Sequence, residues 1–247
     1  MHLPLETPLK LMPPNPLLLI LVLAVAGCGN SGTSPVVPVA PAATSGPAAG
    51  STAGSPLTSL DGGAAAEEDA AAEGMGRAIF AAGCFWCVEQ AFDGVDGVVS
   101  TVSGYTGGSV PAPSYRQVTA GNTGHYEALE VRFDPARVSY EDLLAVFWRN
   151  VDPTDEDGQF CDRGSSYRGA IFALDDAQRR AAQASKEALM ADPDAPGPIV
   201  TPVVDAAPFY DAEDYHQDYY LKNPLRYRYY KTSCGRAARL EELWGPA

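Results

Sequence analysis

The chain has 247 residues, with 17 Lys and Arg against 31 Asp and Glu and a formal net charge of -14 at pH 7. This length allows one domain of ordinary size or two small ones. The acidic balance excludes proteins that hold a phosphate backbone with clustered Lys and Arg, so we expect no nucleic-acid partner.

The chain opens with an apolar run over residues 17–26, LLLILVLAVA. The run is too short for the roughly 20 residues of a membrane-spanning helix, but it is typical of the core of a signal peptide. The sequence VAGC at residues 25–28 resembles the lipobox of bacterial lipoproteins, in which cleavage before the cysteine leaves that cysteine lipidated. We therefore expect a lipoprotein-type signal peptide over residues 1–27 and lipidation of Cys28. An ordinary secretory signal that removes Cys28 is the alternative.

Residues 28–75 consist mostly of Ala, Gly, Pro, Ser and Thr and show no periodicity. Such a stretch buries too little apolar area to offset the entropy of ordering it, so it predicts a flexible tether. The folded domain is expected over residues 76–247. The protein is then exported and held on the membrane only by the lipid at Cys28, with the folded domain in the periplasm or otherwise outside the cytoplasmic membrane. No spare apolar stripe is evident, which favours a monomer.

The first folded elements are a short strand and a helix joined by a glycine. Residues 78–82, AIFAA, read as a buried strand, Gly83 as a tight turn, and residues 84–92 as a helix with apolar side chains at helical spacing. Cys84 then stands at the helix N-terminus, where the helix dipole lowers the pKa of a thiol and raises its thiolate fraction. The alternative is a small buried side chain that opens a helix.

An alternating pattern over residues 124–134 predicts another strand, with Leu129, Val131 and Phe133 on one face. Counting back in steps of two places Glu127 on the same apolar face. Burial disfavours the charged form of a carboxyl, so the pKa of Glu127 should rise, which makes it a candidate general acid. If the strand begins one residue later, Glu127 points to solvent instead.

Helices and strands are interspersed through the rest of the chain. Ser139 and Asp142 form the reciprocal capping pattern of a helix that runs to Arg149, and Asp175 with Gln178 opens another that runs to about residue 190. Further strands are predicted over residues 168–174 and 199–204, and further helices over residues 211–222 and 237–244. We therefore expect one α/β (α+β) domain of two layers, with a mixed central sheet flanked by helices and a ferredoxin-like core.

The folded part contains Cys84, Cys87, Cys161 and Cys234. Three interpretations are open: two structural disulfides, because exported proteins meet oxidising surroundings; a zinc site; or redox chemistry at a stabilised thiolate. Zinc is disfavoured because four-cysteine sites usually use two close pairs, whereas Cys161 and Cys234 stand alone. Cys161 is expected to be a small buried residue.

Two histidines of the folded part, His125 and His216, have no metal-ligand spacing around them. We expect both to be structural and the protein to hold no metal. His125 shares a strand face with Glu127, so a histidine near the site stays open.

Four motifs, in this order and separation, resemble the peptide methionine sulfoxide reductase A family. They are GCFW at residues 83–86, GYTGG at 104–108, GHYE at 124–127 and YHQ at 215–217. The resemblance spans residues 77–245 and makes 76–247 the catalytic domain. It implies thiol-dependent reduction of the S epimer of methionine sulfoxide, free or in proteins, without a bound metal or cofactor.

Carried over position by position, the resemblance implies that Cys84 is the nucleophile and that Glu127 protonates the sulfoxide oxygen. Tyr115 and Tyr167 would donate hydrogen bonds to that oxygen. These four residues are the implied catalytic set.

The resemblance also implies how the substrate is held. Phe85 and Trp86 would form an apolar pocket for the S-methyl group, and Asp162 would contact the substrate backbone. Asp162 is otherwise an ordinary loop carboxylate in the sequence.

The implied reaction leaves Cys84 as a sulfenic acid, which a resolving thiol converts to an intramolecular disulfide and an external thioredoxin-type dithiol reopens. We expect Cys234 to be the resolving thiol, because a cysteine before a glycine in a C-terminal segment can swing onto the sulfenate. Cys87, one helical turn from Cys84, is the alternative. The competing functions are a thiol-disulfide oxidoreductase that uses Cys84 and Cys87, and a surface binding module with structural disulfides.

Overall fold

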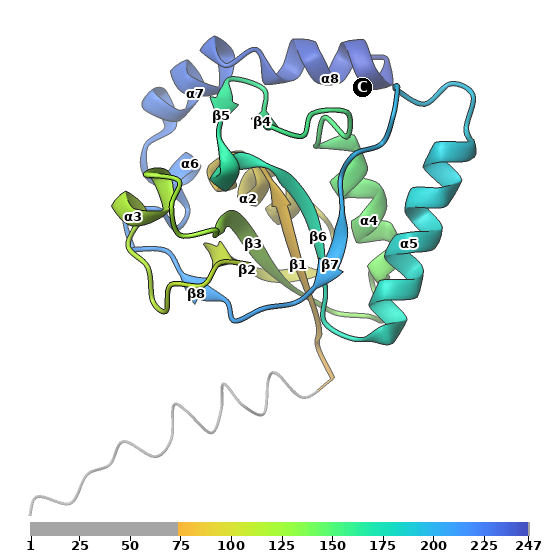
Figure 1. Ribbon diagram of the computed structural model, residues 1–247, viewed down its shortest axis with the longest axis horizontal. Coiled ribbons are helices and arrows are strands. Elements are labelled where there is room, and N and C mark those ends of the chain that lie inside the picture. The colour runs from red at the N-terminus through yellow and green to blue at the C-terminus, as the bar shows by residue number, and fades with distance from the viewer. Residues whose placement is uncertain (1–73, 247) are drawn as a thin grey trace, which may run out of the picture. The chain divides into compact units, whose positions relative to one another are not determined.

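A computed structural model describes residues 74–246 of the chain (Figure 1). The predicted signal peptide, Cys28 and nearly all of the predicted tether lie outside the described residues. Within 74–246, none of the helices combines the length and the apolar character that crossing a membrane requires.

The centre of the domain is a six-stranded sheet with the strand order β7-β6-β1-β3-β2-β8. Its strands are β1 (Gly76–Ala82), β2 (Val98–Thr106), β3 (Tyr126–Phe133), β6 (Gly169–Ala173), β7 (Val203–Asp205) and β8 (Tyr210–Asp211). β1 runs antiparallel to both β3 and β6, β2 runs antiparallel to β3, and β7 joins β6 in parallel, so the sheet is mixed. The order β6-β1-β3-β2, with helices after β1 and β3, is the ferredoxin-like core expected from the sequence.

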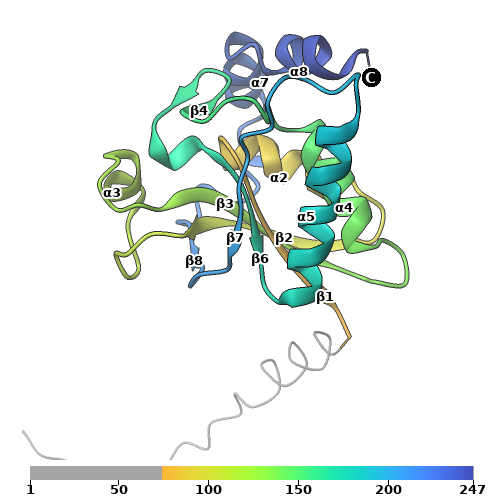
Figure 2. The ribbon, with the colours of Figure 1, turned by 45° about the vertical axis from the view of Figure 1, so that its right-hand side comes forward.

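Helices cover one face of this sheet (Figures 1 and 2). They are α2 (Phe85–Asp93), α4 (Tyr140–Arg149) and α5 (Asp176–Ala191). Alternate residues of β1 and β3, such as Phe80 and Leu129, point to this face and pack against Val88 of α2 and Phe147 of α4. Burial of these side chains stabilises the layer and fixes where α2 begins.

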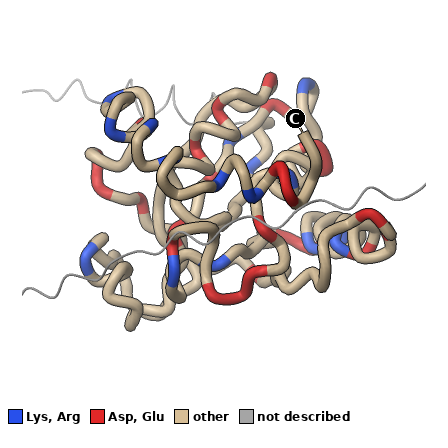
Figure 3. Tube along the Cα trace, turned by 90° about the horizontal axis from the view of Figure 1, so that it is seen from above, with Lys and Arg blue, Asp and Glu red and all other residues tan. Residues whose placement is uncertain are grey.

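Shorter elements surround the sheet. They are α3 (Tyr115–Thr119), β4 (Gly158–Gln159), β5 (Asp162–Arg163), the 3-10 helix η1 (Ser165–Tyr167), α6 (Tyr219–Lys222), α7 (Pro224–Ser233) and α8 (Arg236–Trp244). α7 and α8 run across one end of the sheet, at the top of Figure 1, above the start of α2. Among residues 74–246, acidic and basic positions are interspersed along the trace (Figure 3).

The predicted helix caps are confirmed. The Asp142 amide donates to Ser139 Oγ at 3.1 Å and the Ser139 amide donates back to Asp142 Oδ2 at 3.0 Å. The Gln178 amide donates to Asp175 Oδ1 at 2.8 Å. These bonds satisfy N–H groups that a helix start leaves free, which is why both helices begin where the sequence indicates.

The predicted helix over residues 211–222 is wrong, and only α6 at its end is helical. The side chain of Gln217 bonds to both backbone groups of Ser103 on β2, accepting from N at 2.9 Å and donating to O at 2.8 Å. Asp218 has a φ of 51°, which a helix does not allow. The predicted strand over 199–204 is likewise reduced to β7, and the helix α7 was missed.

Candidate active site

A tight turn between β1 and α2 places Cys84 at the start of the helix. Gly83 has a φ of +82°, and a Cβ on it would lie 2.6 Å from Gln159 Cβ, so both backbone angle and space require glycine. Cys84 is the N-cap of α2 and is 5% exposed. The predicted strand, turn and helix are therefore present, with the thiol at a buried helix start.

Glu127 lies on the helix-covered face of β3, as the alternation predicts, and is 2% exposed. The Phe85 amide at the start of α2 donates to Glu127 Oε2 at 3.2 Å. Burial raises the pKa of Glu127 to about 8, although the Phe85 N–H lowers it in part. Glu127 therefore keeps a proton near neutral pH and can donate it.

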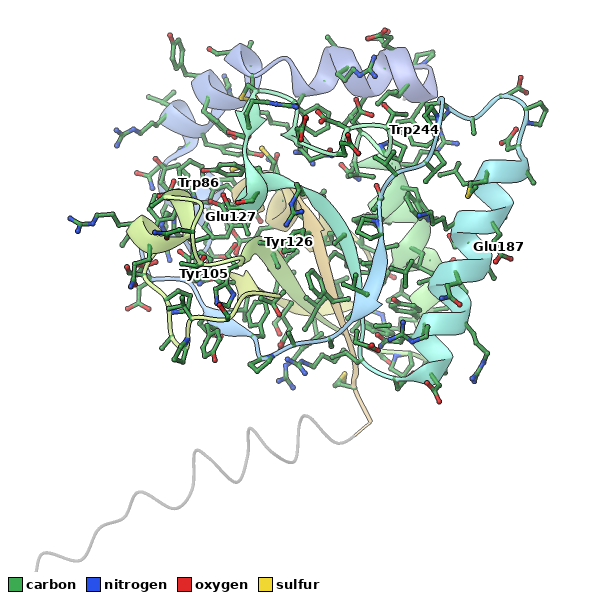
Figure 4. The ribbon with its side chains drawn as sticks, viewed as in Figure 1. Trp86, Tyr105, Tyr126, Glu127, Glu187 and Trp244 are labelled. Atoms are coloured by element: carbon green, nitrogen blue, oxygen red, sulfur yellow. A yellow bond between two sulfur atoms is a disulfide. The ribbon has the colours of Figure 1, made fainter. Side chains whose placement is uncertain are left out.

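A cavity of about 60 Å³ lies between the thiol and this carboxyl. It is lined by Cys84, Phe85, Trp86, Tyr115, Glu127, Asp162, Tyr167 and Tyr230. The structure thus brings together every residue that the sequence assigned to catalysis or substrate binding, apart from the two candidate resolving thiols. Figure 4 shows Trp86 and Glu127 at the end of the sheet nearest to α7.

Two tyrosines face Glu127 in this cavity and contact each other. Burial raises the pKa of Tyr115 to about 12 and also raises that of Tyr167, and the charge of Glu127 raises both further. Both hydroxyls therefore stay protonated and can act as donors to an oxygen that accumulates negative charge.

The expectation that the helix start lowers the pKa of Cys84 is wrong for the resting site. Burial raises this pKa, and the neighbouring Cys87 raises it further. The first free N–H of α2, on Phe85, is engaged by Glu127 instead of the thiol. The hydrogen bond from Cys84 lowers the pKa of Cys87 to about 6, assisted by the charges of Arg236 and Lys231. Of the two free thiols, Cys87 is therefore the one that loses its proton more readily.

With this geometry in hand, similarity to known proteins identifies the family. The family model described as peptide methionine sulfoxide reductase matches residues 76–247. The chain belongs to this family. The peptide methionine sulfoxide reductase MsrA 2 of Rhizobium meliloti (strain 1021) is 54% identical over 168 residues, which are 68% of this chain and 83% of that protein. MsrA of Bacillus subtilis (strain 168) is 50% identical over 168 residues, 68% of this chain and 95% of that protein.

Solved structures of methionine sulfoxide reductases share the fold. Methionine sulfoxide reductase A of Corynebacterium diphtheriae is 35% identical, with a TM-score of 0.57 over 62% of this chain and 76% of that one. Mxr1 from Saccharomyces cerevisiae in reduced form is 33% identical, with a TM-score of 0.58 over 62% of this chain and 87% of that one. The chain is therefore an oxidoreductase that reduces methionine sulfoxide, built on the mixed sheet of this family.

An aromatic groove of about 520 Å³ adjoins the small cavity of this reductase. It shares Trp86, Tyr115 and Tyr230 with the cavity and is continued by Tyr215, His216, Tyr219, Arg226, Tyr229 and Ser233. Trp86 forms the border between the two, stacked on Tyr219 with ring centroids 3.8 Å apart. The groove can therefore bind apolar parts of a ligand next to the ligand residue that enters the cavity.

Both histidines of the reductase domain have structural contacts. Trp86 Nε1 donates to His216 Nδ1 at 3.1 Å, so this histidine orients the border tryptophan. His125 Nδ1 accepts from the Gly108 amide at 3.2 Å, and its Nε2 lies 2.7 Å from the Val110 carbonyl oxygen. Both ring nitrogens of His125 thus have a partner, whereas the Nε2 of His216 is buried without one.

Cys161 and Cys234 form a disulfide across 73 residues of sequence. Cys161 lies in the turn between β4 and β5 and is exposed, so the expectation that it is a small buried residue is wrong. Asp162 lies with them, and the three potential ligand atoms are within 4.8 Å of one another, but the disulfide engages both sulfurs. Both sulfurs of this cluster are therefore engaged with each other in the described state.

Tyr230 of α7 is the cavity residue that sequence reasoning missed. Its hydroxyl donates to Asp162 Oδ2, it lines the cavity beside Cys84, and burial raises its pKa. The missed helix explains the omission, because only a helix over residues 224–233 places Tyr227, Tyr230 and Cys234 near one face. Their spacing of three and four residues was the available signal.

Proposed function

We propose that the reductase acts on the S epimer of methionine sulfoxide, free or in proteins, in the cavity between Cys84 and Glu127. One observation carries this proposal: a buried, protonated carboxyl and a buried thiol line the same cavity of about 60 Å³. A sulfoxide needs a nucleophile at its sulfur and an acid at its oxygen, and these groups supply the two.

In the proposed complex the sulfoxide oxygen faces Glu127, Tyr115 and Tyr167. The S-methyl group lies against Phe85 and Trp86. Asp162, which also lines the cavity, contacts the backbone of a bound peptide. One residue enters the cavity and its neighbours follow the aromatic groove.

The reaction begins when Cys84 passes its proton to the Cys87 thiolate, which already shares that hydrogen bond. The Cys84 thiolate attacks the sulfoxide sulfur while Glu127 protonates the oxygen and the two tyrosines stabilise the developing charge. This attack forms a bond between the Cys84 sulfur and the substrate sulfur. The protonated oxygen then moves from the substrate sulfur to Cys84 as the sulfur–oxygen bond and the bond between the two sulfurs both break. Methionine leaves, reduced by two electrons, and Cys84 is oxidised to a sulfenic acid.

Cys87 then resolves the sulfenic acid, forming a Cys84–Cys87 disulfide and releasing water. The sequence placed Cys234 first for this step. Cys87 takes its place in the proposal because it is the free thiol in hydrogen-bond contact with Cys84, whereas Cys234 is bonded to Cys161. A thioredoxin-type dithiol supplies the two electrons that restore the thiols.

Turnover of the separate R and S epimers with dithiothreitol tests this function, comparing wild type, Cys84→Ser and Glu127→Gln. Glu130→Gln is the matched control, because Glu130 is also a buried glutamate of β3 but pairs with Arg77 away from the cavity. Turnover of the S epimer alone, absent in Cys84→Ser, slowed in Glu127→Gln and kept in Glu130→Gln, is expected. A folded wild type that leaves both epimers untouched, but exchanges disulfides, would favour the thiol-disulfide oxidoreductase.

We also propose that the enzyme is exported as a monomer and anchored by a lipid on Cys28. The apolar run at residues 17–26, the VAGC sequence at 25–28 and the small-residue tether support this. Labelled fatty acid should enter the wild-type protein and not Cys28→Ser, and only the wild type should sediment with membranes. Label in neither protein would contradict the anchor. Sedimentation equilibrium of the detergent-free Cys28→Ser protein should give the mass of one chain.

A further inference from the structure

We propose that Arg226 of α7 selects among protein substrates by pairing, in the aromatic groove, with a Glu or Asp side chain that lies within two residues of the oxidised methionine. The inference rests on the proposed function and adds the chemistry of the residues that flank the methionine sulfoxide. The occupant of the groove is then an acidic segment of the substrate protein.

The size and exposure of the aromatic groove fit a peptide segment. Two of its tyrosines, Tyr215 and Tyr229, are 57% and 77% exposed. Large exposed aromatic side chains around a groove mark a binding surface, because a ligand that covers them removes apolar area from water. The groove has a volume of about 520 Å³, whereas the adjoining cavity has about 60 Å³. One sulfoxide side chain therefore fills the cavity, and the groove is left for the residues beside it.

The groove carries a single positive charge. Arg226 is the only Lys, Arg, Asp or Glu among the described residues that line it. Burial lowers the pKa of His216, so this ring is neutral at pH 7. Glu213, which lies next to His216, already accepts from the Tyr115 amide and the Tyr105 hydroxyl, each at 2.9 Å. A ligand that complements the groove therefore has an acidic group among apolar ones.

The charge of Arg226 has no counter-charge within residues 74–246. Residues 219–240 contain six basic residues and no acidic one. Four of the six have partners in the described part of the chain: Lys222 with Asp218, Lys231 with Gln90, Arg239 with Asp152, and Arg236 with two backbone carbonyl oxygens. The other two, Arg226 and Arg228, are exposed and have neither a hydrogen bond nor an ion pair to residues 74–246. Of these two, only Arg226 lines the groove.

Arg226 also has an unfavourable position for the helix that carries it. α7 begins at Pro224, so Arg226 lies in its first turn, where the helix dipole disfavours a cation. A carboxylate bound at this point would meet both the guanidinium group and the positive end of the dipole. Helix stability does not account for the arginine, whereas an acidic ligand does.

The spacing along α7 predicts how far the acidic side chain is from the oxidised methionine. Arg226 precedes Tyr230 by four residues, both line the groove, and Tyr230 also lines the cavity. Four residues of α-helix rise about 6 Å, whereas an extended chain advances about 3.3–3.6 Å per residue. A side chain one or two residues from the oxidised methionine therefore lies level with Arg226.

Two peptides test the proposal with the full chain. Each contains one S-epimer methionine sulfoxide, is acetylated and amidated at its ends, and has either Glu or Lys at the two positions on both sides of the sulfoxide. The value of kcat/KM should be about tenfold higher for the Glu peptide, because the same charge attracts Glu and repels Lys. This preference should shrink as the salt concentration rises.

Two charge reversals on α7 identify the residue responsible. Arg226→Glu should reverse the preference, so that the Lys peptide becomes the better substrate. Arg228→Glu is the matched control, because Arg228 is also exposed on α7 but does not line the groove, and it should keep the wild-type ratio. The ratio of the two kcat/KM values is taken within each protein, so that a partly unfolded variant still gives a valid comparison.

Equal kcat/KM for both peptides, in a wild type that reduces free S-epimer methionine sulfoxide, would overturn the role of Arg226 and leave the proposed function intact. A preference that Arg226→Glu keeps, or that Arg228→Glu reverses, would overturn it as well. A wild type that reduces neither the peptides nor the free sulfoxide would overturn the proposed function itself.

Discussion

The Phe85 amide donates to the Glu127 carboxyl at 3.2 Å, so the start of α2 orients the acid of the site and not its thiol. The same contact joins β3 to the strand–turn–helix that carries Cys84. Next to this acid, the hydrogen bond from Cys84 lowers the pKa of Cys87, so Cys87 is the more acidic of the two thiols.

The rate of reduction should have a bell-shaped dependence on pH. The thiol pair must have lost a proton, with the pKa of Cys87 at about 6, and Glu127 must keep one, with its pKa at about 8. The rate with the S epimer should therefore rise through about pH 6 and fall as pH rises through about 8. Glu127→Gln should remove the alkaline limb and slow reduction by about 10²- to 10⁴-fold. An unchanged alkaline limb in this variant would mean that another group supplies the proton.

Removal of Cys87 should prolong the life of the sulfenic acid. After one turnover without reductant, Cys87→Ser should bind dimedone at Cys84, whereas the wild type should not, because its sulfenic acid is consumed by the neighbouring thiol. Mass spectrometry of the peptide that contains Cys84 measures the adduct. Cys234→Ser is the comparison, and an adduct in that variant alone would restore Cys234 as the resolving thiol.

Glu89 should make the fold less stable as pH rises. It is 1% exposed on α2, and burial raises its pKa to about 7. The folded state therefore binds this proton more tightly than the unfolded state, and the stability it contributes is present below about pH 4.5 and lost as pH rises through about 7. The free energy of unfolding in urea should be measured for wild type and Glu89→Gln at pH 5 and pH 8. Relative to the wild type, the variant should be more stable at pH 8 than at pH 5 by on the order of 1–3 kcal/mol. An equal difference at both pH values would refute the assignment.

His216 should matter for substrate affinity more than for chemistry. His216→Phe keeps a ring beside Phe85 but removes the acceptor of the Trp86 N–H. With that N–H unsatisfied, the tryptophan loses its orientation, and KM for a peptide substrate should rise about tenfold, the equivalent of one lost buried hydrogen bond. The value of kcat should change less, and steady-state kinetics separate the two. A fall in kcat alone would place His216 in the chemical step.

Local pattern in the sequence determined much of this protein. Alternation along β3 predicted that Glu127 points inward, and the pairs Ser139 with Asp142 and Asp175 with Gln178 predicted where α4 and α5 begin. These features depend on residues a few positions apart, whose spacing translates directly into a face of a strand or a turn of a helix.

The tertiary structure decided the rest, because the deciding contacts join distant residues. Gln217 pairs with Ser103 and thereby breaks a helix that its own neighbours favour. Glu127 accepts from the Phe85 amide, and the contact with Cys84 lowers the pKa of Cys87, assisted by the charge of Arg236 from α8. Cys161 meets Cys234 only because the β4–β5 turn folds beneath the end of α7. The spacing of residues along the chain does not predict these long-range contacts. The tertiary structure brings the distant residues together, and the resulting short distances determine the pKa values and the disulfide pairing.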